Sequence, residues 1–249
     1  MDKTSLHIVK IGGQLAEDPR LLGEVLDRFT VIEAPKILVH GGGVMASEWC
    51  QRLGIPVQMV DGRRITDEAS LEVAIMVYAG LTNKRIVAAL QQRGCNALGL
   101  SGADANIIVS HKRSATTIDY GWVGDIDKVN AAAFEQLLQA GFTPVCCAIT
   151  HDGQGRLLNT NADTIAQEIA GSLATRHKVS LHFYMEKAGV MTNPDHPDTL
   201  LPGINTNEYR QLKASGAISG GMIPKLDNAF RALESGINEV FIGKTRVTL

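Results

Sequence analysis

The chain alternates strand-like and helix-like segments along almost its whole length, and this alternation constrains the fold more than any other feature. The strand-like runs are short and apolar or alternating, and they lie at 5–11, 36–40, 56–60, 96–100, 143–149, 178–184 and 238–243. A strand–helix–strand rhythm is typical of parallel strands that are joined by helical crossovers. We therefore predict an α/β fold with a mostly parallel sheet, formed by one domain with two lobes on a shared sheet.

The segments between these runs space their apolar residues as helices do. Asp18 and Pro19 suit the N-cap and the first position of the first helix. Two helices are predicted within 67–94, because Gly80 and Gly94 each end a helical pattern. The predicted helices are 18–29, 45–53, 67–80, 82–94, 131–141, 162–173, 206–216 and 223–236.

The stretch 102–129 departs from this rhythm. Turn residues there separate short alternating runs, which indicates antiparallel hairpin material at a sheet edge or over a site. No linker, repeat or low-complexity segment divides the chain into separate domains.

Composition excludes several classes of function. The 249 residues carry a net charge of −2, which argues against a nucleic-acid partner. No apolar run approaches the roughly 20 residues of a membrane span, and the N-terminus lacks a signal-peptide pattern. The four cysteines show no CxxC spacing and the histidines no metal-ligand spacing. These features favour a cytoplasmic protein with reduced thiols and no protein-bound metal.

One strand, 36–40, runs straight into Gly41, Gly42 and Gly43. A tight turn needs one or two glycines, so three indicate that the backbone lies against something with its N–H groups bare. An esterase oxyanion loop would need a G-x-S-x-G elbow, and the best candidate, 99–103, fails at its last position. A Walker A loop at Gly243–Thr245 lacks its first glycine and a following helix.

Two interpretations of the triplet remain open. Gly41, Gly43 and Ala46 satisfy the dinucleotide fingerprint G-x-G-x-x-A, with Asp61 about 20 residues on, which would suit an NAD-dependent dehydrogenase. Alternatively, the triplet holds an anionic substrate beside a second glycine turn that holds phosphates. We favour the second interpretation, because it accounts for more of the chain.

The second glycine turn is Gly12–Gly13, which follows Lys10 at the end of the first strand. Two glycine-rich strand ends on neighbouring strands would line one crevice for anions. Arg63 and Arg64 follow another short strand, where a guanidinium suits a planar carboxylate or phosphate.

Further polar residues enter helices near the same predicted crevice. Asn161 suits an N-cap, which leaves Asn159 and Asp163 as polar groups aimed at a site. Lys225 follows Ser219–Gly221 in the first turn of a helix, where a lysine opposes the helix dipole unless a bound anion offsets it.

These pieces, in this order, resemble the acetylglutamate kinases of the amino-acid kinase superfamily. The matching stretches are "VKIGG", "ILVHGGG", "DGRRITD", "GLSGADANII", "GWVGDIDKVN", "LNTNAD" and "SGGMIPKLDNAFRAL", and they span about residues 5 to 243. The resemblance implies an open αβα sandwich in a single domain, with residues 1–173 binding the acylated glutamate and 174–249 binding the nucleotide. The implied reaction transfers the γ-phosphoryl of ATP, with Mg²⁺, to the side-chain carboxylate in arginine biosynthesis.

The resemblance also implies roles for individual residues. Lys10 and Lys225 would stabilise the transferring phosphoryl group, and Asp163 would orient them. The substrate would be bound by the amides of Gly42 and Gly43 and by Arg64 and Asn159, and the nucleotide phosphates would lie against Gly12 and Gly13. A carboxylate is already a nucleophile at neutral pH, so this chemistry needs amides, lysines and Mg²⁺ rather than a general base.

Some features depart from the family pattern. "FYMEKAGVM" at 183–191 replaces a Thr-Asp-Val type run, and Val44 follows the triplet where proline is frequent. The stretch that usually separates the last strands of the fold is nearly absent. The first and last departures concern the adenine side of the site. Hexameric relatives carry a helix before the first strand, which here starts by Ser5, so we expect a homodimer that is insensitive to arginine.

The acyl group of the substrate is left open between acetyl and succinyl. A succinyl tail carries a second carboxylate, which needs a cation or several donors. The candidate cations are Arg63, Lys112 and Arg113. A further alternative is a nucleotide-binding regulator with an inactive site.

Overall fold

We analysed the fold in a computed structural model, which describes residues 3–60, 63–115, 117–193 and 196–249. The strands are β1 Thr4–Ile11, β2 Lys36–His40, β3 Gln58–Val60, β4 Arg63–Ile65, β5 Ala97–Leu100, β6 Ile108–Lys112, β7 Gly124–Val129, β8 Thr143–Cys147, β9 Ile149–His151, β10 Leu157–Asn159, β11 His177–Tyr184, β12 Gly203–Asn205, β13 Glu239–Ile242 and β14 Thr245–Thr248. The α-helices are α1 Gly13–Glu17, α2 Pro19–Thr30, α3 Gly43–Arg52, α4 Glu68–Ile75, α5 Asn83–Gln92, α6 Ala131–Gln139, α7 Ala162–Leu173, α8 Thr206–Ala214 and α9 Met222–Glu234. The remaining helical segments are a π-helical turn at Met76–Thr82 and short 3₁₀ turns at Asp104–Asn106 and Pro197–Thr199.

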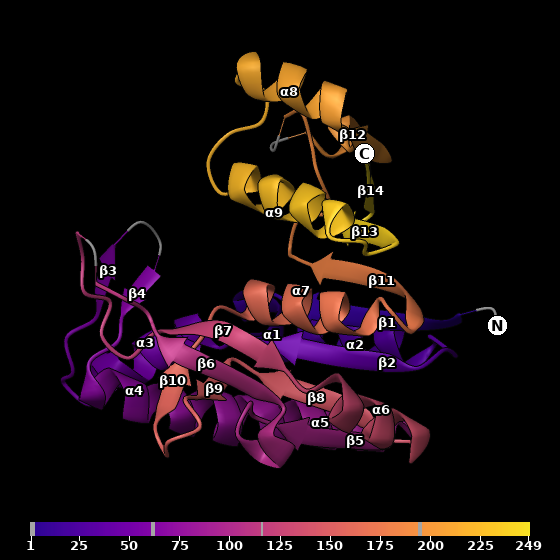
Figure 1. The fold of residues 1–249 in the computed structure, drawn as a ribbon. Coiled ribbons are helices and arrows are strands. Elements are labelled where there is room, and N and C mark those ends of the chain that lie inside the picture. Colours follow the sequence, from indigo (N-terminus) through magenta and orange to yellow (C-terminus); the bar gives the residue numbers. More distant parts are fainter. Residues whose placement is uncertain (1–2, 61–62, 116, 194–195) are drawn as a thin grey trace.

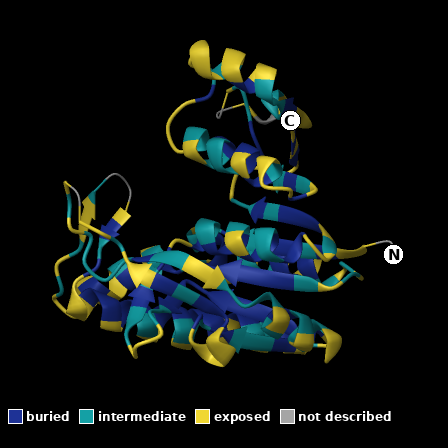
Figure 2. Ribbon diagram, viewed as in Figure 1, coloured by how far each residue is buried: buried dark blue, intermediate teal, exposed yellow. Residues whose placement is uncertain are grey.

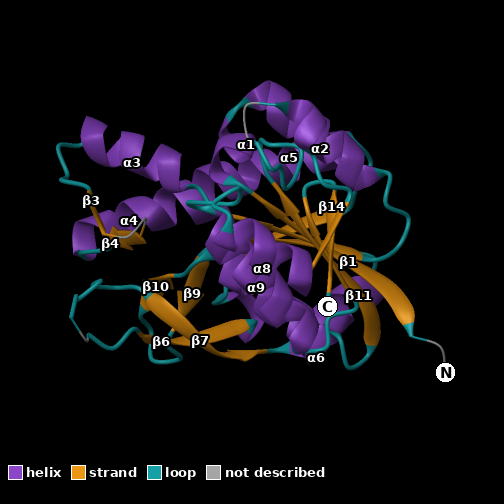
Figure 3. Cartoon of the chain, turned by 90° about the horizontal axis from the view of Figure 1, so that it is seen from above, coloured by secondary structure: helices purple, strands orange, loops and turns teal. Residues whose placement is uncertain are grey.

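The central sheet has eight strands in the order β12-β14-β13-β11-β1-β2-β8-β5. All neighbours from β13 to β5 pair in parallel, and only β14 pairs antiparallel with β13 (Figure 1). The predicted α/β class with a mostly parallel sheet is therefore confirmed. Viewed from above, the strands fan out, as the twist of a parallel sheet requires (Figure 3).

Helices cover both faces of this sheet and form two apolar cores, as the αβα arrangement predicts. One core holds the buried side chains of α7 and α9 against Leu6, Ile8 and Leu181 of β1 and β11. The other holds Phe29 of α2, Ile86 and Leu90 of α5, and the opposite face of β1. The strands are accordingly buried, whereas the outer helix faces are exposed (Figure 2).

The predicted hairpin region is confirmed as a separate sheet of four strands in the order β10-β9-β6-β7. Its β6 and β7 pair antiparallel from Ile108↔Val129 to Lys112↔Gly124. The sequence patterns missed its short β9 and β10, and also β4, β12 and β14, because three- or four-residue strands carry too few positions for an alternation to be recognised.

The prediction of two helices within 67–94 was wrong. Residues 68–92 form one continuous helix, in which a π-helical turn replaces the expected break at Gly80. Gly80 therefore lies inside the helix rather than at a C-terminus. This helix is the one stretch of the described residues that could cross a membrane by length and composition, and 44% of its most apolar window is buried inside the fold.

Candidate active site

Two predicted lysines meet one predicted carboxylate beside the carboxyl end of β1. Lys10 Nζ lies 2.8 Å from Asp163 Oδ1, and Lys225 Nζ lies 3.8 Å from Asp163 Oδ2. The three residues come from β1, α7 and α9, which are far apart in sequence. The structure therefore brings together the three residues predicted to perform the chemistry.

The two lysines keep the Asp163 carboxyl of this cluster ionised. Desolvation opposes the ionised form of Asp163, but Lys10 and Lys225 more than compensate and lower the pKa of the carboxyl below its usual value. The Lys10 side chain is only 12% exposed. A cluster of two ammonium groups and one carboxylate leaves one net positive charge, which suits a bound anion.

The glycine triplet ends β2 and begins α3, with Gly42 as the N-cap. Gly42 has no side chain with which to cap this end of the helix itself. The first N–H groups of a helix have no intrahelical acceptor, so Gly43 and Val44 present amide donors at this turn. A methyl group at Gly42 would lie 2.7 Å from the ring of Tyr78, which explains why glycine is needed there.

The second glycine turn lies between β1 and α1. Gly12 N–H donates to Tyr184 O of β11 at 3.1 Å, so this amide is engaged within the sheet. Gly13 is the first residue of α1. Glu17, at the end of α1, accepts a hydrogen bond from Met45 N in the first turn of α3 at 2.8 Å. One carboxylate therefore links the two glycine turns.

Arg64 is buried beside the glycine triplet. Its Nη2 donates to Gly43 O at 2.7 Å and to Ser47 Oγ at 2.5 Å. Its Nη1 is buried and has no hydrogen-bond partner among the residues that the structure describes. A buried guanidinium nitrogen without a partner is costly, so this site suits a ligand that supplies an acceptor.

Asn159 is joined to the Arg64 strand through Thr66. Asn159 Nδ2 donates to Thr66 Oγ1 at 3.0 Å, and its backbone N–H donates to Trp122 O at 2.9 Å. Thr66 also pairs with Gly121. A side chain at Gly121 is disfavoured, because φ there is 71° and an added methyl group would clash with Thr66 O. The segment around Gly121 thus holds the two predicted substrate-binding residues in one network.

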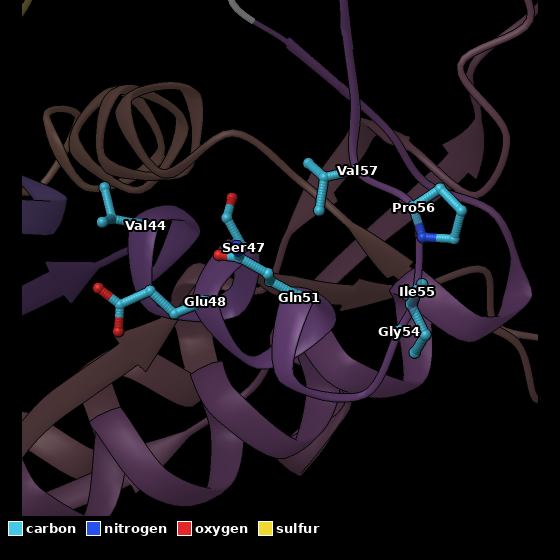
Figure 4. A pocket seen from close by; sticks show the side chains of 8 residues that line it. All are labelled: Val44, Ser47, Glu48, Gln51, Gly54, Ile55, Pro56 and Val57. Atoms are coloured by element: carbon cyan, nitrogen blue, oxygen red, sulfur yellow. The ribbon is translucent and has the colours of Figure 1, made fainter.

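A hollow of about 530 Å³ opens along the outer side of α3. Val44 and Ser47 of α3 line it on one side, and Ile55–Val57 line it on the other (Figure 4). Because Val44 follows Gly43 and Ser47 contacts Arg64, this hollow borders the glycine turn, whereas the lysine cluster lies outside it.

Three further candidate residues, Arg113, Lys112 and Thr245, have structural partners. Arg113 forms a bidentate pair with Asp125, and Lys112 Nζ lies 4.6 Å from the centre of the Trp122 ring. Arg63 is exposed on β4. Asp61 of the dinucleotide pattern lies outside the described residues. Thr245 Oγ donates to Leu201 O, which gives it a structural role, in agreement with the rejection of a Walker A loop.

Sequence reasoning missed Tyr78, Ser47 and Glu17. Ser47 stands four residues after Gly43, which places it over the first turn of the helix that the triplet begins. Tyr78 was hidden by the wrong helix break at Gly80. Glu17 gave no signal, because its partner is a backbone amide 28 residues away.

Comparisons with known proteins agree with this fold. The amino acid kinase family matches residues 5–244 of the chain. The acetylglutamate kinase of Phocaeicola vulgatus is 48% identical over 240 residues, which cover 96% of this chain and 93% of that protein. The acetylglutamate kinase of Cytophaga hutchinsonii is 49% identical over 238 residues, covering 95% and 90% of the two chains.

A solved structure shows the same fold. The protein smu.665 of Streptococcus mutans UA159 superposes with a TM-score of 0.79 at 23% identity and covers 98% of each chain. The family match over almost the whole chain and the kinase relatives set aside the dehydrogenase interpretation of the glycine triplet. The chain belongs to the amino acid kinase family.

Proposed function

We propose that this protein is an acetylglutamate kinase, which transfers the γ-phosphoryl group of ATP to the side-chain carboxylate of N-acetyl-L-glutamate. The observation that carries the proposal is the half-buried cluster of Lys10, Asp163 and Lys225. The kinase relatives at 48% identity support the substrate and a place in arginine biosynthesis.

The cluster suits phosphoryl transfer between two anions. As the substrate carboxylate attacks the γ-phosphorus, negative charge spreads over the phosphoryl oxygens and the leaving phosphate. Lys10 and Lys225 approach from different elements and would stabilise that charge, while Asp163 fixes both ammonium groups before the reaction. The carboxylate attacks in its ionised form, so no proton needs to be removed.

The acylated glutamate would occupy the side of the crevice formed by α3 and β4. Gly42 and Gly43 would donate amide hydrogens to it, and Arg64 and Asn159 would bind its non-reacting carboxylate. The buried Nη1 of Arg64 supports this assignment, because it needs an acceptor. Residues 1–173 would thus form the substrate lobe and residues 174–249 the nucleotide lobe.

ATP would place its phosphates against Gly12 and Gly13. No group of three or more His, Cys, Asp or Glu side chains that could hold a metal ion occurs among the described residues. Asp163 is already engaged by two lysines. We therefore propose that Mg²⁺ enters with the ATP phosphates, which hold it through oxygen ligands and water.

We further propose a cytoplasmic homodimer without nucleic-acid or membrane partners. Four buried free cysteines support a reducing compartment, and the exposed apolar side chains Trp49, Leu53 and Met76 support self-association. Light scattering at micromolar concentration should give the mass of a dimer, unchanged by arginine. A monomer or hexamer would contradict this prediction.

Turnover with trapped product tests the proposed function. Purified protein is incubated with MgATP and either N-acetyl- or N-succinyl-L-glutamate, and the acyl phosphate is captured with hydroxylamine. We expect a clear preference in kcat/KM for N-acetyl-L-glutamate. A preference for the succinyl compound would replace the substrate but keep the reaction, and no hydroxamate with either compound would favour a regulator with an inactive site.

The succinyl alternative has one candidate cation left on this surface. Arg113 is neutralised by Asp125, and Lys112 lies over Trp122. Arg63 is exposed on β4 and is the candidate that remains for a second carboxylate. An Arg63→Ala variant separates the cases, because only a succinyl-specific enzyme should lose kcat/KM by a large factor.

A further inference from the structure

The π-helical turn at Met76–Thr82 lies next to the glycine triplet. A backbone hydrogen bond shows its wider geometry, because Asn83 N–H donates to Tyr78 O, five residues back. Turns of this kind are rare and occur frequently at functional sites. The contacts of Tyr78, Thr82 and Asn83 indicate the role of this turn.

Tyr78 is packed against the glycine triplet. Its ring lies where a side chain at Gly42 would be, and its hydroxyl oxygen is 3.8 Å from the position of a methyl group at Gly43. The side chain is only 4% exposed. Arg64 lies close enough to the phenol for its charge to act on it. Tyr78 therefore contacts the glycine turn and lies beside Arg64.

Thr82 and Asn83 reach the same turn. Thr82 Oγ1 lies 3.6 Å from the position of a methyl group at Gly42. Asn83 Nδ2 donates to His40 Nε2 at 3.0 Å and to Val145 O at 2.9 Å. Because Nε2 accepts this bond, Nδ1 of the neutral His40 carries the hydrogen and donates to Gly41 O at 2.8 Å.

The wide turn explains how three side chains reach one target. In a regular α-helix, each residue is rotated by about 100° from the last, so Asn83, five positions after Tyr78, would lie about 140° around the axis from it. A π-helical turn adds a residue to the turn, so side chains four and five positions after Tyr78 lie on the same side as Tyr78. An unbroken α-helix would turn Asn83 away from the side of the helix that carries Tyr78 and Thr82.

We propose that the π-helical turn Met76–Thr82, through Tyr78, Thr82 and Asn83, is the device that fixes the glycine turn 40–43 in its substrate-binding geometry. Tyr78 is a positioning residue in this scheme, since it acts through the backbone of Gly42 and Gly43. The kinetic part of the inference rests on the proposed function, whereas the structural part does not.

The test uses Tyr78→Leu, with Tyr209→Leu as the matched control. Tyr209 is equally buried, at 5% exposure, but lies on α8, away from the glycine turn. Hydrogen–deuterium exchange of peptides covering 40–46 is the first readout. We expect exchange there to rise about tenfold in Tyr78→Leu and to stay unchanged in Tyr209→Leu.

The second readout is the split of kinetic constants. Tyr78→Leu should raise KM for N-acetyl-L-glutamate about tenfold or more and leave KM for ATP nearly unchanged, because the nucleotide lies on the other side of the crevice. Tyr78→Phe, which keeps the ring, should restore both readouts. If Tyr78→Leu does not fold, Asn83→Ala, which removes the bond to His40, is judged by the same criteria.

Two results would overturn the inference. One is wild-type exchange over 40–46 in Tyr78→Leu, and the other is faster exchange with an unchanged KM. If the wild-type protein phosphorylates no acylated glutamate, the proposed function fails, and the exchange experiment alone decides whether the π-helical turn holds the glycine turn.

Discussion

At the scale of single residues, the site depends on Asp163. Its carboxylate receives ammonium groups from two other elements, and their charges lower its pKa despite its burial. The sequence pointed to these residues because Lys10 ends a strand before a glycine turn and Asp163 and Lys225 lie in the first turns of helices, and the family resemblance implied their joint role. Ser47 and Tyr78 could not be predicted in the same way, because their roles depend on tertiary contacts with Arg64 and Gly42.

Replacement of either lysine tests the cluster. Lys10→Ala and Lys225→Ala should each leave the fold intact and lower kcat about 100-fold or more, since one preorganised transition-state contact is worth about 3 kcal/mol. Steady-state kinetics with circular dichroism of each variant provides the measurement. Lys128→Ala, at an exposed position of β7, is the control and should turn over normally. Near wild-type kcat in both lysine variants would show that the crevice is wrongly assigned.

At the scale of elements, the sequence predicted regular helices well and unusual ones poorly. Asp18 and Asn161 cap α2 and α7 through side-chain bonds, as expected from their types and positions. Gly80 has the residue type of a helix C-terminus but lies within a continuous helix, because packing of Tyr78 and Asn83 against the glycine turn outweighs local preference. A single sequence carries no pattern for such a π-helical turn.

The link between α1 and α3 gives a prediction at this scale. Glu17→Ala removes the acceptor of Met45 N, so it should loosen both glycine turns and lower the free energy of unfolding by about 1 kcal/mol, as for a lost helix cap. KM for N-acetyl-L-glutamate should rise with it. Glu17→Gln keeps an oxygen acceptor and should recover most of the loss, while Glu24→Ala on the exposed side of α2 should change neither quantity. Equal loss in the alanine and glutamine variants would contradict the hydrogen-bond explanation.

At the scale of the whole molecule, the strand–helix alternation was enough to predict the sheet and its two covered faces. Buried parallel strands have few compatible arrangements, so the pattern of apolar runs constrains the fold strongly. The sequence patterns missed β4, β9, β10, β12 and β14 for a physical reason. Such short strands are stabilised by neighbours distant in sequence rather than by their own residues.

Burial of neutral histidines makes the stability of the molecule depend on pH. Desolvation lowers the pKa of His40 to about 4, and desolvation together with the charge of His7 lowers the pKa of His182 to about 4. The unfolded chain binds these protons near pH 6.5. The contribution of the two neutral histidines to the free energy of unfolding is therefore fully present above that pH and is lost as the pH falls toward 4.

Chemical denaturation at pH 7 and pH 5 measures this effect. The wild-type free energy of unfolding should fall between these values, with each buried histidine contributing up to about 2 kcal/mol. His182→Phe keeps the stacking on Phe241 and should reduce the fall, whereas His196→Gln at an exposed position should not. An equal fall in wild-type and His182→Phe protein would show that His182 does not titrate in this range.

The most direct test of the central claim follows oxygen from the substrate. N-acetyl-L-glutamate labelled with ¹⁸O in its side-chain carboxylate is incubated with the protein and MgATP, and the acyl phosphate is cleaved by hydroxylamine at its acyl carbon. If the carboxylate oxygen attacks the γ-phosphorus, the released inorganic phosphate carries one ¹⁸O atom and the organic product is the hydroxamate. Released phosphate without the label, or ADP formed without hydroxamate, would contradict the account.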